Sequence, residues 1–457
     1  MTATDGAGNV QSPSTSATFT LDTAPPVLEI LSITPDPAGQ GTVTLTVRAM
    51  DLSTGVAAPP TVTVAQNGVA AVTATLVGCA PAAFPLGPAV TGTCTYTYVV
   101  ATGADGLATA VATASDVSGN SATVARQFLV DASGPSFSMT FTPSPVRGGE
   151  PVQISVVGQD ASSGFGAAPT ISILTANGIS SGTLTATSCA PAAFPVLPNG
   201  PAPAIGNDQA QLTCLYLWTP PTSTATDGVA TATITGFDRA GNGIVVTGTV
   251  ILDNSLPTTT ITQPVATIYG AAGVAGFSGG PGSRMNGTAT DDRAGIREVG
   301  GRLTRTVSGV TTYWNGSTWS ALDNGFILVT NLGSPGALST TWEITNGPAA
   351  DDWGDGTFTL QVRAVDLAGT GNVQSPVTSV IFIVDSVGPA IVITSITPDP
   401  ANATAVTITV QASDVTSGVS AAPAVTVTQN GGGALPAGAG VCGAGLGVPG
   451  ATVTCTY

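Results

Sequence analysis

The chain repeats itself, and this repetition constrains its fold more than any other feature of the sequence. The segment Asn9–Pro13 returns as Asn372–Pro376, and Ser32–Pro37 returns as Ser395–Pro400 at the same offset. Internal similarity at a fixed offset is the signature of an array in which each repeat is one structural module. The repeats therefore define the domain organisation of the chain.

Each repeat ends with the same local pattern. An Asp-x-x-Gly-Asn-like turn is followed by an alternating strand, a closing Asp and soon a Pro; the closing residues are Asp22, Asp131, Asp253 and Asp385. They delimit the ranges 1–22, 23–131, 132–253, 254–385 and 386–457. We interpret the first range as the C-terminal part of a truncated repeat and the last as the N-terminal part of another. We therefore expect the sequence to be a fragment of a longer protein.

Residue alternation predicts an all-β fold. Gly and Pro make up about a fifth of the chain, below the roughly 25–30% of unstructured low-complexity sequences. In the repeat 23–131, alternating Val, Ile, Thr and Ala predict strands near 26–33, 42–50, 60–66, 72–78, 91–100, 108–114 and 122–130. Strands at such spacing, separated by Gly, Pro or Asn, are typical of a β-sandwich. We predict a tandem array of sandwiches with about seven strands each.

The charged residues exclude several classes of function. The chain has 26 acidic and 10 basic side chains, and it has no His. All the basic residues are Arg, without the clusters that phosphate contacts require, so we expect no nucleic-acid partner. Without His, neither a Ser-His-Asp nor a Cys-His catalytic set can form, and we expect no enzyme. No apolar run approaches the ~18 residues of a membrane span, so we expect no membrane insertion.

Six cysteines form three local pairs, Cys79/Cys94, Cys189/Cys214 and Cys442/Cys455. Zinc needs four nearby ligands, and no repeat offers more than two Cys with no His. We predict one disulfide in each Cys-containing repeat; the alternative is a pair of reduced, buried thiols. Disulfides would indicate an oxidising compartment outside the cytoplasm.

The repeat 254–385 lacks Cys and is rich in Trp. Tyr313, Trp314 and Trp319 flank an Asn-Gly pair, which is a strong signal for a β-hairpin turn. Exposed aromatic rings on such a hairpin could stack on sugars, so these three residues are candidate glycan contacts. The alternative is that the rings pack in the core of the sandwich.

Aspartates gather where one repeat meets the next. Each junction combines the closing Asp, the Asp of the Asp-x-x-Gly-Asn turn and a turn Asp from the following repeat. The candidate calcium ligands are Asp22, Asp51, Asp116, Asp131, Asp160, Asp238, Asp253, Asp292, Asp366, Asp385 and Asp414. Calcium binds six to eight oxygens, which carboxylates and loop carbonyls supply. The alternative is turn chemistry alone, in which Asp caps the turn and Gly takes the left-handed conformation.

The repeat endings, such as Asp238–Asn242 followed by Val250–Asp253 and Pro257, resemble those of bacterial Ig-like repeats in large secreted and surface adhesins. The resemblance covers essentially the whole chain and implies Ig-like sandwiches. It also implies calcium at the linkers, as in related adhesin repeats. It does not specify a ligand, because the sandwich hosts many functions.

These observations predict a non-enzymatic stalk of an extracellular or cell-surface bacterial protein. Short linkers such as Asp131–Pro135 favour a semi-rigid rod, because Pro restricts the chain directly after the joint. The stalk would hold an adhesive or catalytic tip away from the envelope, with an extracellular ligand that the sequence does not identify. The rival hypothesis is a set of carbohydrate-binding or spacer modules accessory to a secreted hydrolase.

Overall fold

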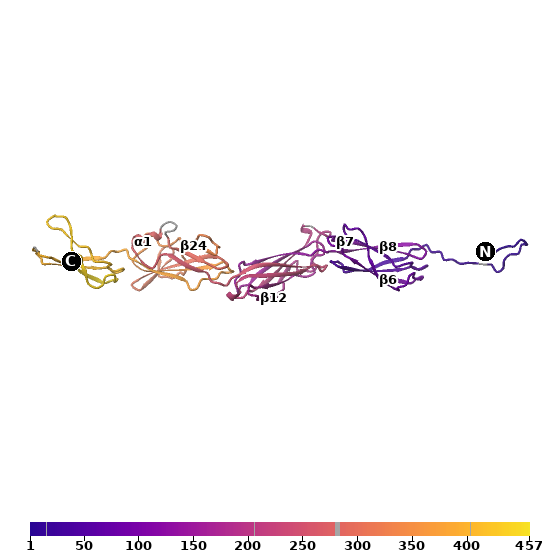
Figure 1. Cartoon of the computed structure of the whole chain (residues 1–457), viewed down its shortest axis with the longest axis horizontal. Helices are drawn as coiled ribbons and strands as arrows, with labels where there is room; N and C mark the ends of the chain where they lie inside the picture. Colours follow the sequence, from indigo (N-terminus) through magenta and orange to yellow (C-terminus); the bar gives the residue numbers. More distant parts are fainter. Residues whose placement is uncertain (15, 205, 279–283, 403) are drawn as a thin grey trace. The chain divides into compact units, whose positions relative to one another are not determined.

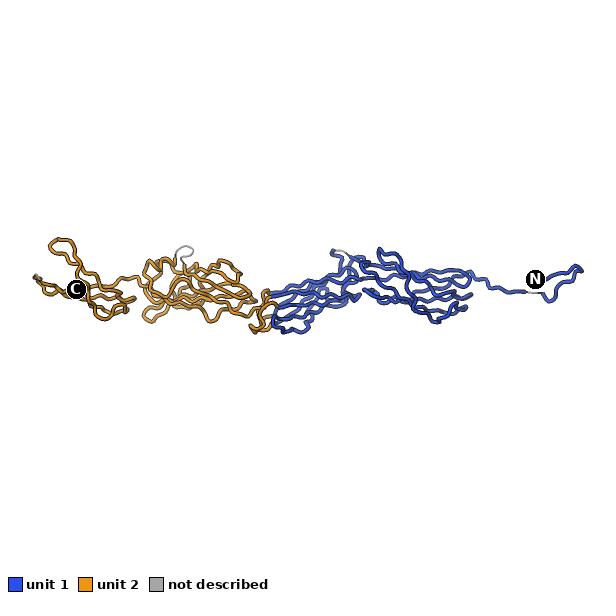
Figure 2. Tube along the Cα trace, viewed as in Figure 1, with its two compact units in different colours: residues 1–142, 151–219, 230–250 blue, residues 143–150, 220–229, 251–457 orange. Residues whose placement is uncertain are grey.

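The computed structural model describes residues 1–14, 16–204, 206–278, 284–402 and 404–457, and most of its ordered elements are strands (Figure 1). The chain divides into two compact units (Figure 2). Unit 1 comprises residues 1–142, 151–219 and 230–250, and unit 2 comprises residues 143–150, 220–229 and 251–457. The predicted all-β class is confirmed, and the strands form tandem Ig-like β-sandwiches. The predicted division into five repeat ranges stays a prediction.

The first sandwich lies in unit 1 and has two four-stranded sheets, in the orders β1-β2-β6-β5 and β4-β3-β7-β8. Its strands are β1 (Val27–Thr34), β2 (Thr42–Met50), β3 (Thr61–Ala65), β4 (Val72–Thr73), β5 (Thr75–Ala80), β6 (Thr91–Val99), β7 (Gly106–Ser115) and β8 (Ser121–Val130). Alternate residues point inward, so that Leu45 and Tyr96 of one sheet pack with Val62 and Phe128 of the other. This alternation is the two-residue period of a strand with one buried face.

The strand predicted over 72–78 is divided between the two sheets. β4 pairs with β3, whereas β5 pairs with β6 in the opposite sheet. Ala74 lies between them, and its N–H donates to the carbonyl of Val62 at 2.8 Å. The first sandwich therefore has eight strands where the alternation predicts seven, because a continuous pattern does not show where the chain changes sheets.

The second sandwich repeats this arrangement, with sheets in the orders β13-β14-β10-β9 and β12-β11-β15-β16. Its strands are β9 (Ser136–Thr142), β10 (Val152–Asp160), β11 (Thr170–Leu174), β12 (Ser180–Leu184), β13 (Ser188–Ala190), β14 (Ala210–Trp218), β15 (Gly228–Phe237) and β16 (Gly243–Leu252). All of them lie in unit 1 except the beginning of β15 and the end of β16. Phe165, Tyr216 and Ile154 are fully buried.

The third sandwich belongs to unit 2 and joins a four-stranded sheet, β17-β19-β24-β23, to a six-stranded sheet, β18-β26-β25-β20-β21-β22. Its elements are β17 (Thr258–Gln263), β18 (Ile268–Tyr269), α1 (Ala271–Ala275), β19 (Asn286–Thr290), β20 (Ile296–Val307), β21 (Val310–Trp314), β22 (Trp319–Ser320), β23 (Thr330–Leu332), β24 (Ser339–Ile344), β25 (Gly356–Asp366) and β26 (Thr378–Val384). Aromatic rings fill its core, among them Trp342, Phe358 and Phe382.

The last segment of unit 2 contains a four-stranded sheet, β27-β28-β32-β31, and a two-stranded sheet, β29-β30. Its strands are β27 (Ala390–Thr397), β28 (Thr407–Ser413), β29 (Thr426–Val427), β30 (Leu435–Pro436), β31 (Val441–Cys442) and β32 (Thr452–Thr456). β27 is exposed along its whole length, whereas its counterpart β1 buries Ile30 and Ile33 against the other sheet of the first sandwich. The described residues after 385 contain no counterpart of β7 and β8, which are two of the four strands of that covering sheet.

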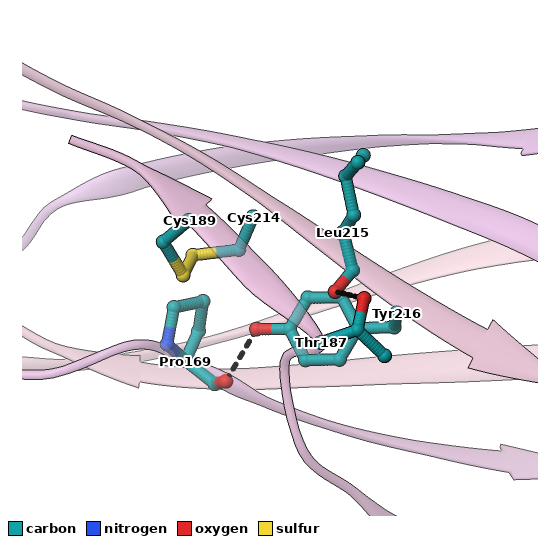
Figure 3. The surroundings of a disulfide bond; sticks show 6 residues. All are labelled: Pro169, Thr187, Cys189, Cys214, Leu215 and Tyr216. Atoms are coloured by element: carbon teal, nitrogen blue, oxygen red, sulfur yellow. Dashed lines mark hydrogen bonds between the residues drawn. A yellow bond between two sulfur atoms is a disulfide. The ribbon is translucent and has the colours of Figure 1, made fainter. Parts of the chain in front are cut away.

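All three predicted disulfides are present, and the alternative of reduced thiols is therefore wrong. Each bridge joins directly opposed residues of neighbouring strands; the pairs are Cys79–Cys94, Cys189–Cys214 and Cys442–Cys455. In the second bridge the Cα atoms are 4.1 Å apart (Figure 3). Beside it, the Tyr216 hydroxyl donates to the carbonyl of Pro169 at 2.5 Å. The bridge fixes a short edge strand to its sheet and closes the Pro-rich excursion between the two cysteines.

The two cysteines of each bridge differ in burial, which the sequence pattern did not predict. Cys94 of β6 and Cys455 of β32 are buried, and so is Cys214 of β14. Cys94 belongs to the core of the first sandwich, and Cys455 packs with Val453 and Ala412 in the last segment. Their partners lie on the edge strands β5, β13 and β31 and are partly exposed. Each bridge therefore anchors an edge strand to the sandwich interior.

Candidate metal centres

The structure brings most of the predicted aspartates together in three clusters. They are Asp22/Asp51/Asp116, Asp131/Asp160/Asp238 and Asp253/Asp291/Asp292, and in each the three carboxylate oxygens lie within 4.8 Å of one another. Each cluster combines a closing Asp with two turn aspartates from the sandwich that follows it. We name them the first, second and third acidic clusters.

A tight turn positions the middle aspartate of each cluster. In the second cluster, Asp160 ends β10, and its Oδ1 accepts the N–H groups of Ser162 at 3.1 Å and Gly164 at 2.5 Å. In the first cluster, Asp51 Oδ1 accepts from Gly55 at 2.7 Å in the same way. This geometry is the Asp turn that the sequence offered as an alternative to calcium. It uses one carboxylate oxygen, so the second oxygen can face the cluster.

Two features require glycine at this turn: its positive φ and the close approach of neighbouring backbone atoms. Gly55, Gly164, Gly295 and Gly418 have φ of +85°, +76°, +84° and +77°. A Cβ added to Gly164 would also overlap the backbone of Val196, which lies in the excursion closed by the disulfide. The N–H of Phe165 donates to the Val196 carbonyl at 2.8 Å, and the reverse bond is 2.9 Å. The disulfide-closed excursion therefore packs directly on the turn that carries Asp160.

An asparagine joins the closing Asp to the Asp of the Asp-x-x-Gly-Asn turn, and sequence reasoning missed this role. Asn242 Nδ2 donates to Asp238 Oδ2 at 2.6 Å and to the backbone carbonyl of Asp131 at 2.7 Å. Asn120 makes the corresponding bonds to Asp116 and Asp22, and Asn372 makes them to Asp366 and Asp253. The recurrence of Asn in the pattern was the available signal, but its partner on the preceding strand is distant in sequence.

The second cluster concentrates buried negative charge. Asp131, Asp160 and Asp238 are 1%, 4% and 6% exposed. Burial, and then the neighbouring carboxylates, raise the pKa of Asp160 and of Asp238 to about 6. Burial likewise raises the pKa of Asp131. Arg239 is adjacent in sequence to Asp238, but its guanidinium bonds the Ser163 carbonyl at 3.3 Å and forms no ion pair with the described carboxylates.

Two of the clusters contain a buried oxygen atom without a described hydrogen-bond partner, which is a feature expected of a site for a hard cation. Ser162 is 4% exposed, and its Oγ has no hydrogen-bond partner among the described residues. It lines a cavity of about 140 Å³ together with Asp131 and Asp160. In the third cluster, Asp291 Oδ1 is buried and also lacks a described partner. Oxygen atoms without partners beside carboxylates match the ligands that calcium prefers.

The third cluster differs from the prediction in one ligand. Asp291, which was not among the predicted ligands, holds the turn position by accepting from Gly295 at 2.7 Å. Asp292 is half exposed and forms an ion pair with Arg293. Asp366 is fully buried but lies outside this group of three. Burial, followed by the charges of Asp291 and Asp366, raises the pKa of Asp253 to about 6. The consecutive Asp291-Asp292 pair did not show which carboxyl would occupy the turn.

In the first and last junctions, the turn aspartates Asp51 and Asp414 have lowered pKa values. Burial raises the pKa of Asp51, but bonds from Gly55, Thr54 and Ser53 outweigh it, and the pKa is lowered. Asp385 and Asp414 line one cavity of about 590 Å³ but form no cluster of three with another described acidic residue. The N–H of Ser417 is the largest influence on the pKa of Asp414, which is also lowered.

The three aromatic candidates do not form an exposed platform. Trp314 is 4% exposed, and its Nε1 donates to the carbonyl of Asn346 at 2.8 Å. Trp319 packs on Trp314 with ring centroids 5.4 Å apart, and its Nε1 donates to the Asp352 carbonyl at 2.9 Å. Tyr313 is half-buried beneath the guanidinium of Arg302. Trp314 and Trp319 therefore follow the alternative of packing in the core of the sandwich, whereas Tyr313 lies outside that core.

No protein-family model and no curated protein matches the sequence. Among solved structures, a tetra-tandem repeat in the extending region of a large adhesion protein is 16% identical, with 95% of this chain and 98% of that chain covered and a TM-score of 0.33. Fibronectin(III)-like modules of Clostridium thermocellum CbhA are 15% identical over 50% of this chain and 93% of theirs, with a TM-score of 0.22. The BspA C-terminal domain of Streptococcus agalactiae is 12% identical over 50% of this chain and 99% of its own, with a TM-score of 0.26.

No helix in the described part of the chain has the length and apolar character needed to span a bilayer.

Proposed function

We propose that the chain is a non-enzymatic structural segment of a large extracellular bacterial surface protein. Its Ig-like sandwiches serve as a stalk that presents an adhesive or catalytic region, and its acidic clusters bind calcium. The second cluster is the observation that carries this proposal. Three buried carboxylates face one another there, beside a buried hydroxyl without a partner among the described residues.

Calcium suits this cluster better than a transition metal does. The potential ligands are carboxylate and hydroxyl oxygens, with no His anywhere in the chain and every Cys in a disulfide. Hard oxygen ligands select calcium or magnesium, and calcium accepts the irregular geometry of side chains from separate loops. A bound divalent cation would also relieve the repulsion among carboxylates that burial deprives of water.

The ligands would tie consecutive repeats together. Asp131 directly follows β8 of the first sandwich, whereas Asp160 and Asp238 lie on turns of the second sandwich. Asp253 follows β16, whereas Asp291 and Asp292 belong to the third sandwich. A cation held by both sides would restrict the linker, which is the mechanical property that a stalk needs.

The disulfides support an extracellular or cell-surface location, since such bonds form and persist in oxidising compartments. The partner would then be an extracellular ligand of the larger protein. Glycan binding through Tyr313, Trp314 and Trp319 is not proposed, because Trp314 and Trp319 pack in the core and the Tyr313 ring is covered by the Arg302 guanidinium. A spacer within a secreted hydrolase is the alternative setting for the same structural role.

Thermal unfolding of the whole chain, in excess calcium and in a chelator, tests the proposal. A ligand that binds the folded state alone at a hundredfold excess over Kd adds about 2.7 kcal/mol per site. We expect calcium to raise Tm by several degrees and Asp238→Asn to reduce the gain of the second sandwich. Asp208→Asn is the matched control, since Asp208 is exposed and outside the clusters. An identical Tm in calcium and chelator would refute calcium binding and leave the structural role to be judged separately.

A further inference from the structure

A second polar site lies in the third sandwich, away from the acidic clusters. A cavity of about 290 Å³ opens between β20, β25 and the segment 326–332. Its lining includes Arg297, Glu298, Phe326 and Arg363, together with apolar walls from Val299, Leu332 and Val365. A cavity of this size is close to the lower limit of small-ligand sites and matches a single ring-sized group.

The cavity holds an arginine without an anionic partner. Within the described residues, Arg363 is the one arginine whose guanidinium has neither a hydrogen bond nor an ion pair. Its contact is with the ring of Phe326, whose centroid lies 4.4 Å from Cζ. The chain has 26 acidic and 10 basic side chains. A shortage of acidic residues therefore does not explain why Arg363 has no carboxylate partner. Phe326 orients the guanidinium and leaves its edge available to hydrogen-bond a planar anion.

The backbone of β20 shapes the site. Gly300 lies opposite Arg363 in the sheet, and a Cβ at Gly300 would come within 3.1 Å of Phe326 Cβ. The absence of a side chain there lets Phe326 approach the strand. Leu328 then pairs with Gly301, its N–H donating to the Gly301 carbonyl at 2.9 Å. Backbone hydrogen bonding at Gly301 thus holds the segment beside β20, and this wall of the cavity is fixed by the fold.

The other charged residues of the cavity define the charge of its occupant. Arg297 supplies a second positive charge, although its guanidinium already donates to the Thr370 carbonyl at 2.6 Å and lies 4.0 Å from Glu298. The Glu298 carboxylate would repel a second negative charge but can accept hydrogen bonds from hydroxyl groups. A ligand with one carboxylate and several hydroxyls therefore fits better than a peptide with consecutive acidic residues.

We propose that the cavity beside Arg363 binds the carboxylate of an acidic sugar of the uronic acid type. Arg363 forms the paired hydrogen bonds to the carboxylate, and Arg297 contributes positive charge. Glu298 accepts from the sugar hydroxyls, and Val299, Leu332 and Val365 contact the ring. The site would let this segment of the stalk contact an acidic polysaccharide directly. It involves no residue of the acidic clusters and does not rest on calcium binding.

Titration of the whole chain with methyl glucuronide, followed by saturation-transfer NMR and calorimetry, tests the proposal. We expect millimolar binding that weakens with added salt, and much weaker binding of the neutral methyl glucoside. Arg363→Gln should lower the affinity about tenfold or more, because it removes charge-assisted hydrogen bonds. Arg363→Lys keeps the charge without the planar fork and should bind with intermediate affinity. Arg48→Gln is the matched control, since Arg48 pairs with Glu29 on the first sandwich.

Each opposite result overturns the proposal. No glucuronide binding to the wild-type chain, or equal affinity for glucoside, would remove the acidic sugar as ligand. Unchanged binding by Arg363→Gln would place the site elsewhere. Arg363-dependent binding of a glutamate-rich peptide more tightly than the glucuronide would assign the cavity to a protein partner. If Arg363→Gln lowers Tm, its loss of binding is not specific to the site. The binding of the Arg363→Lys variant then tests the proposal, because this variant retains a cation beside the Phe326 ring.

Discussion

Gly164 shows how a single residue connects the disulfide-closed excursion with the acidic cluster. Its N–H bonds Asp160, its φ of +76° excludes most side chains, and its α-carbon faces the backbone of Val196. The turn therefore cannot form with any larger residue unless the excursion moves away. Sequence reasoning recognised the left-handed turn but not this contact, because the Pro-rich run does not indicate what it packs against.

We predict that Gly164→Ala destabilises the second sandwich by more than about 2 kcal/mol, since strained backbone and overpacking act together. Gly178→Ala is the matched control, because Gly178 has φ of +86° but nothing within 4 Å of an added Cβ. It should cost about 1 kcal/mol from backbone strain alone. Denaturant unfolding of both variants measures the difference. Equal costs would contradict the packing role.

At the scale of the element, the period-2 alternation predicted most strands of the first sandwich but not their assignment to sheets. Apolar and polar residues alternate from Val72 to Leu76 without a break, yet β4 and β5 lie in opposite sheets, because tertiary packing determines which strands pair. The cysteine pairs were predictable because both strands of a pair are close in sequence, although the burial of Cys94 and Cys455 was not. Asp291, Ser162 and the cavity at Arg363 were also missed, since each depends on residues that only the folded chain brings together.

The disulfides give a prediction at the same scale. Removing the Cys189–Cys214 bridge as the double Ser variant should destabilise the second sandwich by roughly 3 kcal/mol in the chain-entropy model. It should also weaken calcium binding by the second cluster, because the freed excursion no longer supports the turn of Asp160. Denaturant unfolding and calcium titration measure the two effects. A variant that loses stability but keeps its calcium affinity would separate the excursion from the site.

For the whole molecule, the pH dependence of stability depends on whether the clusters hold a cation. Asp160, Asp238 and Asp253 have folded pKa values of about 6, above the ordinary value of 3.8. Between about pH 4 and 6 the folded chain therefore binds more protons than the unfolded chain. The free energy of unfolding in a chelator must then fall as pH rises through this window. A group that titrates independently contributes about 1.4 kcal/mol for each unit by which its folded pKa exceeds its unfolded pKa.

We predict that acidification from pH 7 to pH 5 raises Tm in a chelator but lowers it in excess calcium. In the chelator, protons relieve repulsion among Asp131, Asp160 and Asp238, to which Asp105 also contributes. In calcium, protons compete with the cation for the same carboxylates. Calorimetry at both pH values, with Asp160→Asn beside the control Asp208→Asn, measures this reversal. A Tm that moves in the same direction under both conditions would show that calcium does not occupy these carboxylates.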